Sequence, residues 1–391
     1  MIRVNDVSTF SLQEQQYYSR QWILPGMSEQ AQQRLKAFKV LLIGAGGLGC
    51  PVGLYLAGAG VGTLGIADDD TVDLSNLHRQ VVHDVTKLGQ LKVISMMQRL
   101  EALNPYIRVV PHTIRVSCDT IVSLLADYDL VVDGSDNFAT RFLVGDACYL
   151  ANKPLVQGAV YGFEGQLAVY PSSGPDEKTA CHRCVFEIAP PEHLRPSCAE
   201  AGVVGVVPGT VGLMMATLAI KMLLPLGPSL TGQLLHYNAL TLSTKHYTTA
   251  RNLSCPLCGN HPTLQNLSAH DSPIQTTCTS PEMEISLLEA LQWMNSGAPV
   301  IDVREPDELA ADCLEGVLNW PLSRWHEATY PSETMLEALQ KASSEGHPWL
   351  MLCRSGQRSL QATQWLKTRG YPQAVNVAGG MLAWRSGVNS C

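Results

Sequence analysis

Short apolar runs that end abruptly in polar residues or glycine recur along the first part of the chain. Residues 38–43, 63–67 and 130–132 form three such runs. After the first run, Leu48, Val52, Leu56 and Ala59 have the spacing of an apolar helix face. Strands that alternate with helices predict a parallel α/β sheet. Residues 161–170 look like an added hairpin strand, so we expect a mixed sheet.

The pattern changes after residue 260. Residues 260–281 turn polar, with three prolines and many serines and threonines, which predicts a linker at 263–281. A second and smaller α/β pattern follows, with strand candidates at 300–303 and 350–353. We therefore expect one domain at 1–262 and another at 282–391, which fits the length of 391 residues.

One segment, residues 203–224, is apolar enough to resemble a membrane span. Glycines and a proline interrupt it and Lys221 lies inside it, so we expect a loop that leads into a buried helix. Residues 1–11 lack the pattern of a signal peptide. These features predict a cytoplasmic protein that does not enter a membrane.

Composition and charge narrow the classes of function. The chain is 46% hydrophobic and 16% charged, which is a globular balance. Its net charge of −8 is spread along the sequence and argues against a nucleic-acid partner or a polybasic membrane binder. Twelve cysteines in a chain without a signal peptide indicate metal binding or catalysis rather than disulfides.

A glycine-rich turn follows the first expected strand. Gly44, Gly46 and Gly49 have the spacing of a phosphate-binding turn, in which glycine lets the backbone approach the phosphates at a helix N-terminus. An acid about twenty residues later, Asp68 or Asp70, would bind ribose hydroxyls. The turn alone fits a dinucleotide oxidoreductase, or a structural turn, as well as other nucleotide enzymes.

The sequence that follows distinguishes these alternatives. Residues 68–80 read DDDTVDLSNLHRQ, Lys92 follows, and residues 133–137 read DGSDN. With residues 18–21, this pattern closely resembles the adenylating enzymes that activate ubiquitin-like sulfur-carrier proteins, namely the molybdopterin-synthase and thiamine-pathway adenylyltransferases. The resemblance covers about residues 13–260. It implies a Rossmann-like adenylating domain that binds ATP through Gly44, Gly46, Gly47, Gly49, Asp68, Asp70, Ser75, Asn76, Leu77, His78, Arg79, Lys92, Asp136 and Asn137.

The residue types also suit the chemistry of adenylation. A carboxylate that attacks the α-phosphate of ATP brings two anions together, so cations must neutralise the triphosphate and a carboxylate must hold Mg²⁺. Arg79 and Lys92 fit the first need, and Asp136 fits the second. Each of these residues also has a purely structural interpretation: Arg79 as a surface ion pair, Lys92 as a solvated helix charge and Asp136 as a helix N-cap. The family further implies that Arg20 reaches a phosphate in the partner subunit of a homodimer.

Two CxxC pairs predict a metal site. Cys181, Cys184, Cys255 and Cys258 have the spacing of a closed four-cysteine zinc site, which is typical of structural Zn²⁺. Two separate redox pairs are the alternative, but neither pair lies at the strand-to-helix junction that a thioredoxin-like motif needs.

Cys198 lies beyond the first CxxC pair, after a proline-rich stretch. It matches the cysteine that forms a thioester or a disulfide in the family. The alternative is a buried structural thiol, because cysteine is often buried as a small hydrophobe.

A second reactive cysteine, Cys353, follows a strand candidate and precedes a helix. A loop curled around a cysteine points backbone amides at the sulfur, and Arg354 and Arg358 add positive charge, which favours an anionic persulfide. Residues 302–306 and 379–384 complete a resemblance to rhodanese sulfurtransferases over about residues 283–388. Related phosphatases have an arginine six residues after the cysteine, where this chain has Ser359; the shorter loop suits a sulfur atom.

The two resemblances together imply one reaction sequence. The first domain would adenylate the C-terminal glycine of a small ubiquitin-like sulfur carrier that ends in Gly-Gly. The rhodanese-like α/β domain would then transfer sulfur from Cys353, loaded by a persulfide or by thiosulfate, to give a thiocarboxylate. The alternatives are a protein that only adenylates, or a binding protein with a regulatory rhodanese module.

Overall fold

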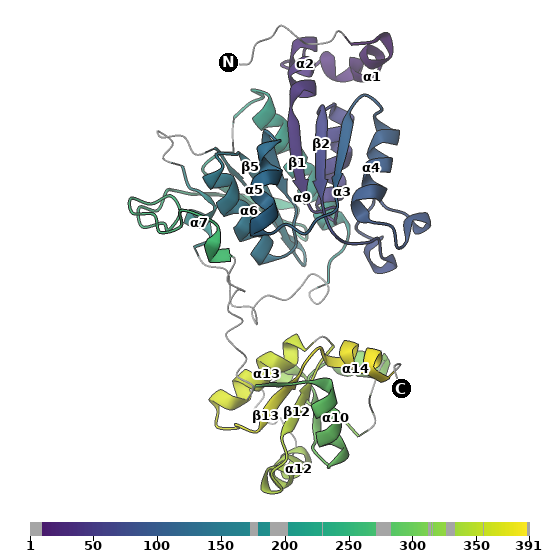
Figure 1. The fold of residues 1–391 in the computed structure, drawn as a ribbon, viewed down its shortest axis with the longest axis vertical. Helices are drawn as coiled ribbons and strands as arrows, with labels where there is room; N and C mark the ends of the chain where they lie inside the picture. Colours follow the sequence, from purple (N-terminus) through teal and green to yellow (C-terminus); the bar gives the residue numbers. More distant parts are fainter. Residues whose placement is uncertain are drawn as a thin grey trace. The chain divides into compact units, whose positions relative to one another are not determined.

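The computed structural model describes residues 10–172, 179–187, 202–228, 230–270, 283–311, 314, 316–325, 333–354 and 356–388. The described residues up to 270 and those from 283 onward belong to two separate compact units, each with its own sheet (Figure 1). Cys198 lies outside the described residues, as does most of the expected linker.

The first unit is built on one eight-stranded sheet with the order β3-β2-β1-β4-β5-β6-β7-β8. Its strands are β1 (Lys39–Ile43), β2 (Thr63–Ala67), β3 (Arg108–His112), β4 (Leu130–Asp133), β5 (Leu155–Tyr161), β6 (Glu164–Tyr170), β7 (Gln233–Asn238) and β8 (Ser243–Thr248). The first five strands are parallel, and β6 to β8 are added as antiparallel hairpins. The predicted mixed sheet and the hairpin strand at 161–170 are thereby confirmed.

Helices cover this sheet on both faces (Figure 1). They are α1 (Leu12–Trp22), α2 (Glu29–Ala37), α3 (Gly49–Ala59), α4 (Lys92–Leu103), α5 (Cys118–Ala126), α6 (Phe138–Leu150), α7 (His182–Val185) and α9 (Val206–Leu223). One apolar core contains residues of α3, α4 and α9, and a second contains residues of α5 and α6. Because β1 lies between β2 and β4, the strand order reverses at β1, and an open parallel sheet binds its ligands at such a point.

The apolar segment at 203–224 forms α9, as a loop followed by a helix. By length and composition alone α9 could cross a membrane, and it is the one described helix that could. Half of it is buried inside the structure, where Val211 and Met215 pack against Gly165 of β6 and Gly158 of β5. The helix therefore has the place of a core helix.

The second unit holds a five-stranded parallel sheet with the order β11-β10-β12-β13-β9. Its strands are β9 (Glu284–Ile285), β10 (Val300–Asp302), β11 (Leu318–Asn319), β12 (Trp349–Leu352) and β13 (Ala374–Val377). Its helices are α10 (Leu287–Asn295), α11 (Pro306–Ala311), α12 (Glu333–Ser344), α13 (Gln357–Thr368) and α14 (Gly380–Val388). Cys353 follows the central strand β12 directly, at its carboxyl end.

The start of the expected linker packs against the first unit. The sequence places the linker at 263–281, but Leu264 contacts the cysteine cluster and Leu267 the core around α5. His270 Nε2 lies 2.8 Å from a carboxylate oxygen of Asp146, which is buried in α6. Residues 264–270 therefore form a docked tail of the first unit.

Candidate active sites

The glycine turn after β1 is shaped by a close backbone approach. Gly44 has a φ of +89°, a conformation that favours glycine. A Cβ on Gly49 would lie 1.9 Å from the Gly44 carbonyl oxygen, so only glycine fits at the first position of α3. The turn thereby places the N-terminus of α3 beside the carboxyl end of β1.

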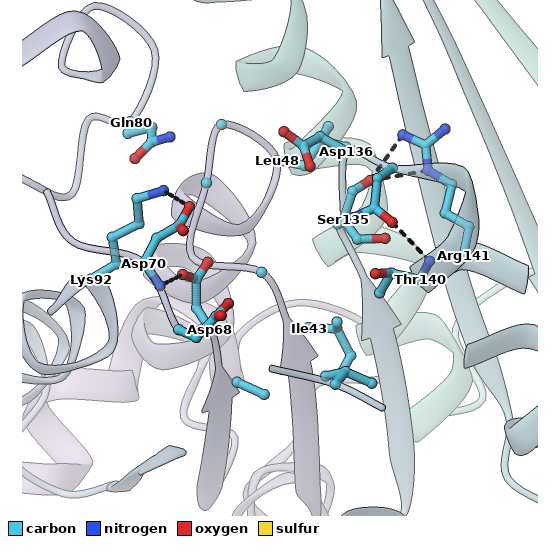
Figure 2. A pocket seen from close by; sticks show the side chains of 18 of the residues that line it. Ile43, Leu48, Asp68, Asp70, Gln80, Lys92, Ser135, Asp136, Thr140 and Arg141 are labelled. Carbon is cyan, nitrogen blue, oxygen red and sulfur yellow. Dashed lines mark hydrogen bonds and ion pairs between the residues drawn. The ribbon is translucent and has the colours of Figure 1, made fainter. Parts of the chain in front are cut away.

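A cavity of about 320 Å³ opens at the carboxyl ends of β1, β2 and β4. The predicted residues that line it are Gly44, Gly46, Gly47, Asp68, Asp70, Lys92, Asp136 and Asn137. Figure 2 shows Lys92 and Asp70 on one side of the glycine turn and Asp136 with Arg141 on the other. The cavity therefore presents a cation and a carboxylate to one bound molecule.

Lys92 is held at the cavity by an ion pair. Its Nζ lies 2.8 Å from Asp70, and its side chain is only 7% exposed while that of Asp70 is 68% exposed. Lys92 is the first residue of α4, so the plain reading as a solvated helix charge is wrong. A phosphate that entered the cavity would find a cation already desolvated, which strengthens the attraction between them.

Asp68 supports the turn rather than only facing the cavity. Its two carboxylate oxygens accept from the amides of Ala45 (2.8 Å) and Asp70 (2.9 Å). Burial raises the pKa of this carboxyl, and the two amides act against that rise. Each oxygen keeps a second lone pair for a ligand hydroxyl.

Asp136 does not cap α6, although its position just before the helix suggested that it would. The N-cap of α6 is Asn137, whose side chain accepts from the Thr140 amide at 2.8 Å. Asp136 precedes the cap, is exposed and lines the cavity, and among the described residues it has no hydrogen bond or ion pair. Its carboxylate fits a metal ligand, whereas Asn137 is explained by capping.

The other predicted nucleotide residues lie outside the cavity lining. Gly49 acts through packing, while Ser75, Asn76, Leu77 and His78 lie on or just after η1 (Leu74–Asn76). The Arg79 guanidinium donates to Asn76 Oδ1 (2.9 Å) and to the Ser75 carbonyl (3.1 Å). Arg20 is exposed on α1.

Six polar residues of the lining were not predicted from the sequence: Asp69, Gln80, Arg115, Ser135, Thr140 and Arg141. Ser135 Oγ and Gln80 Oε1 are buried without a hydrogen-bond partner, as expected for groups that meet a polar ligand. Arg141 donates twice to the Ser135 carbonyl, at 3.0 and 2.9 Å, and so holds the loop after β4. Ser135 lies within the DGSDN motif and could have been found there, whereas Arg141 has no local signal.

A second cavity of about 330 Å³ adjoins the first and shares Asp136, Arg141 and Val160 with it. Its walls come from β5, β6 and the start of α6, and they are largely apolar and aromatic, with Phe138, Phe142 and Tyr161 among them. Asp136 thus borders both cavities.

The four predicted cysteines form one cluster. Their Sγ atoms all lie within 4.8 Å of one another, with contacts of 3.6 Å (Cys181–Cys255), 3.7 Å (Cys181–Cys184) and 3.2 Å (Cys184–Cys258). A tetrahedral site with Zn–S bonds of about 2.3 Å has sulfur–sulfur edges of about 3.8 Å. The Asn252 amide donates to Cys184 Sγ at 3.2 Å, as amides do to bound thiolates. The cluster could hold a metal ion and does not consist of two separate pairs.

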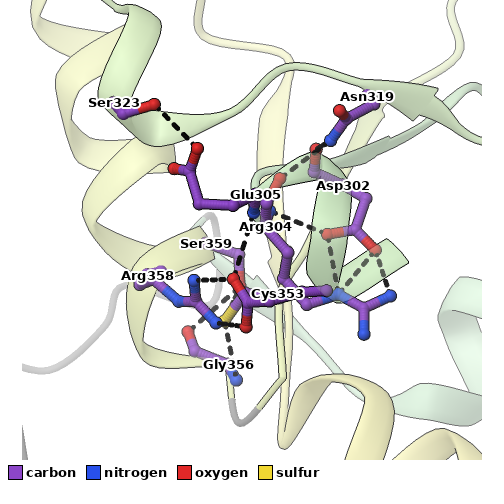
Figure 3. A network of polar contacts seen from close by, with 10 residues as sticks. Asp302, Arg304, Glu305, Asn319, Ser323, Cys353, Gly356, Arg358 and Ser359 are labelled. Carbon is purple, nitrogen blue, oxygen red and sulfur yellow. Dashed lines mark hydrogen bonds and ion pairs between the residues drawn. The ribbon is translucent and has the colours of Figure 1, made fainter. Parts of the chain in front are cut away.

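Cys353 lies in a tight loop between β12 and α13, and it is 1% exposed. Its Sγ accepts from the Gly356 amide (3.2 Å) and the Ser359 hydroxyl (3.3 Å), as Figure 3 shows. The amides of Met381 and Leu382, in the first turn of α14, donate to the carbonyls of Cys353 and Arg354. The N-termini of α13 and α14 therefore both meet this loop.

The glycine pair before α14 lets this loop close. A Cβ on Gly380 would lie 2.3 Å from the Cys353 carbonyl oxygen and 2.6 Å from the Gly356 nitrogen. Gly356 itself has a φ of +89°, and its Cβ would lie 2.9 Å from the Gly379 nitrogen. These contacts explain the glycines of the 379–384 segment.

The two arginines expected to surround the sulfur are placed differently. Arg358 forms a two-pronged ion pair with Glu308 of α11 at 2.6 and 2.7 Å, and hydrogen bonds from Arg358 lower the pKa of Glu308 to about 2. Arg354 is exposed and, with Arg304 and Arg385, lines a cavity of about 260 Å³. The guanidinium of Arg358 is thus directed at Glu308.

Two family models match the chain. The ThiF family matches residues 18–257, and the rhodanese-like domain matches residues 286–387. The chain is 39% identical over 385 residues to the probable adenylyltransferase/sulfurtransferase MoeZ of Mycobacterium tuberculosis, covering 97% of this chain and 95% of that relative. It is 37% identical over 393 residues to the adenylyltransferase and sulfurtransferase MOCS3 of Sus scrofa, covering 95% and 86%.

Solved structures share the fold of the first unit. Escherichia coli MccB superposes with a TM-score of 0.55 at 22% identity, covering 65% of this chain and 75% of that chain. At this identity the likeness shows the fold alone.

Proposed function

This chain belongs to the ThiF family and carries a rhodanese-like domain as well, and on that basis we propose that it converts the C-terminal carboxylate of a small ubiquitin-like sulfur carrier into a thiocarboxylate. Its activities are those of an adenylyltransferase and a sulfurtransferase, as in the relatives named MoeZ and MOCS3. The observation that carries the proposal is the pairing of one cavity, lined by Lys92 and Asp136, with a buried cysteine loop in the other unit.

The first step is the attack of the carrier carboxylate on the α-phosphate of ATP, with pyrophosphate as the leaving group. The glycine turn offers backbone amides at the N-terminus of α3, and Lys92 offers a positive charge. Mg²⁺, when bound, supplies charge neutralisation at the phosphates. We propose that Asp136 is its ligand, since this carboxylate has no other partner among the described residues.

The second cavity suits the carrier's C-terminal segment. A segment that ends in Gly-Gly is narrow enough to pass Arg141 and Val160, which border both cavities. Its residues before the glycines would meet the apolar walls around Phe138 and Phe142. The attacking carboxylate would then arrive beside Asp136.

The second step moves sulfur from Cys353. The terminal sulfur of a Cys353 persulfide attacks the acyl carbon of the adenylate, and AMP leaves with the bonding electrons. A second thiolate then attacks Sγ of Cys353, so that the carrier thiocarboxylate leaves and a disulfide remains for an external dithiol to reduce. We propose Cys198 as that second thiol, and thiosulfate or a protein persulfide as the source of the sulfur.

Three further elements belong to the proposal. Zn²⁺ would be bound by Cys181, Cys184, Cys255 and Cys258, because four thiolates without an open position are typical of a structural site. Arg20 would reach the phosphates of a partner subunit in a homodimer, and Arg79 would turn from Asn76 to the triphosphate. A cytoplasmic location also remains a prediction.

The test is ATP–pyrophosphate exchange in the presence of a small carrier that ends in Gly-Gly. We expect Asp136→Ala to reduce exchange by at least a hundredfold, because a metal ligand at the reacting phosphate stabilises charge that develops in the transition state. The control is Asp119→Ala, which removes an exposed carboxylate outside the cavity.

Near-normal exchange in a folded Asp136→Ala variant would contradict the assignment. Oxidation of NADH by the wild-type chain would instead revive the dinucleotide oxidoreductase. If adenylation were the only activity, sulfur from thiosulfate would fail to reach the carrier.

A further inference from the structure

The hydroxyl of Ser359 lies beside the reactive sulfur. Ser359 is fully buried in the first turn of α13. Its Oγ lies 3.3 Å from Cys353 Sγ and 3.2 Å from the Gly356 carbonyl oxygen. One hydroxyl proton can point to only one of these acceptors at a time, so Ser359 has two alternative hydrogen bonds of similar length.

The burial of Cys353 makes the Ser359 hydroxyl important for stabilising negative charge on Sγ. Cys353 is 1% exposed, so water cannot replace a missing donor, and a buried thiolate without donors is strongly disfavoured. Arg358 is directed at Glu308, with the two-pronged ion pair described above. Among the described residues, the donors within hydrogen-bond distance of Sγ are the Gly356 amide and the Ser359 hydroxyl.

We propose that Ser359 is a catalytic residue for the loading of sulfur onto Cys353 and for its discharge, which donates to Sγ when it is a thiolate and to the Gly356 carbonyl when it is part of a persulfide. This inference rests on the proposed role of Cys353. During loading by thiosulfate, the Cys353 thiolate attacks the outer sulfur, a new S–S bond forms, and sulfite leaves with the electron pair of the broken S–S bond. Negative charge then moves from Sγ to the terminal sulfur.

Unloading reverses this movement of charge. A nucleophile such as cyanide attacks the terminal sulfur, thiocyanate forms, and the Cys353 thiolate is the leaving group. The Ser359 hydroxyl turns back to Sγ as charge develops there. Stabilisation of a leaving thiolate accelerates its departure, because the better the leaving group, the faster the S–S bond breaks.

The experiment compares Ser359→Ala and Ser359→Thr in the full chain. Two readouts are measured: the pH dependence of iodoacetamide alkylation at Cys353, followed by the mass of the peptide that holds it, and the rate at which cyanide discharges the persulfide. Loss of a hydrogen bond to a charged group changes an equilibrium constant by about ten- to a hundredfold. We therefore expect the alkylation midpoint of Ser359→Ala to rise by about one to two pH units. Discharge should slow about tenfold or more, with the KM for thiosulfate unchanged, and Ser359→Thr should restore both.

Thr363→Val is the matched control. Thr363 is also fully buried on α13 and donates to the Ser359 carbonyl at 2.9 Å, but it does not touch the sulfur. It should leave both readouts within about twofold of wild type. Wild-type values in Ser359→Ala, or an equal effect of Thr363→Val, would overturn the inference. A wild-type chain that forms no persulfide at Cys353 would instead overturn the proposed function.

Discussion

Ala45, in the middle of the glycine turn, is held at both of its backbone groups. Its amide donates to Asp68, and its carbonyl lies 3.1 Å from His83 Nε2. The carbonyl can only accept, so Nε2 carries the proton and Nδ1 accepts from the Ser95 hydroxyl at 2.9 Å. Ser95 lies on α4, whose first residue is Lys92, so His83 connects the turn to the helix that presents the cation.

His83→Leu should therefore weaken ATP binding more than it slows the reaction. Loss of one buried hydrogen bond costs about 0.5–1.5 kcal/mol, which corresponds to a rise of about two- to twelvefold in the KM for ATP. His83→Gln keeps an amide donor for the Ala45 carbonyl and should recover most of the loss. Initial rates of pyrophosphate exchange give the KM for ATP and the kcat of both variants. A fall in kcat alone would contradict this role of His83.

The same residue predicts part of the pH dependence of stability. Burial lowers the pKa of His83 below its usual value, so the folded state favours the neutral imidazole. Above about pH 6.5 both folded and unfolded chains hold it neutral, and stability is unaffected. Below that pH the unfolded chain binds the proton first, so His83 reduces stability until the folded pKa is also passed.

Single residues also show where sequence reasoning succeeds. Gly49 could be chosen in advance because the spacing of the glycine turn after a strand is fixed, whereas Lys92 and Asp136 follow from the resemblance and from the chemistry of adenylation, and both line the cavity. The polar contacts of Arg79 could not be predicted, because Asn76 and the Ser75 carbonyl compete for its guanidinium only once η1 has formed. The Arg358–Glu308 pair joins residues fifty positions apart and has no local signal.

At the scale of elements, two helices meet behind the cavity that Lys92 and Asp136 line. Gly212 of α9 lies against the start of α3, where a Cβ would come within 2.5 Å of Pro51 Cγ and 2.6 Å of the Leu48 carbonyl oxygen. Its neighbour Gly209 on the same helix faces open space, with nothing within 4 Å. The apolar run at 203–224 predicted a buried helix, but only the packed structure shows which glycine is a contact.

Gly212→Ala should destabilise the chain by about 1–3 kcal/mol, because the added methyl group overpacks a backbone contact. It should also raise the KM for ATP, since Leu48 belongs to the glycine turn that faces the cavity. Gly209→Ala adds the same group to the same helix and should be neutral or stabilising by up to about 1 kcal/mol. Urea denaturation of both variants measures their stability. Equal losses of stability would contradict the prediction that the contact with α3 makes Gly212 more sensitive than Gly209.

On the scale of the whole molecule, the last described residue of the first unit is anchored to α6, the helix that follows Asp136. His270 lies within 2.8 Å of Asp146, which lies nine residues after the N-cap Asn137 of α6, or about 14 Å at the helical rise, and Asp136 directly precedes that cap. The next described residue of the second unit is Met283, and residues 271–282 span at most about 45 Å. The composition of 260–281 predicted a linker, but it could not reveal that 264–270 dock on the first unit, since that depends on a buried Asp146.

A linker of this length permits sulfur transfer within one chain, and a mixture of two variants tests whether it occurs. Asp136→Ala lacks adenylation and Cys353→Ala lacks the sulfur-bearing thiol, so neither alone should make thiocarboxylate. A tethered loop faces its own cavity at an effective concentration of about 1 mM, so at 1 μM protein the mixture should show roughly a thousandth of wild-type activity. Its activity per chain should then rise with protein concentration, whereas that of the wild type should stay constant. The alternative is that Cys353 serves the partner of a stable dimer. Half of the randomly mixed dimers would then hold one complete pair, and the mixture would retain about a quarter of wild-type activity at every concentration. Thiocarboxylate measured by carrier mass across a hundredfold range of protein concentration separates the two outcomes.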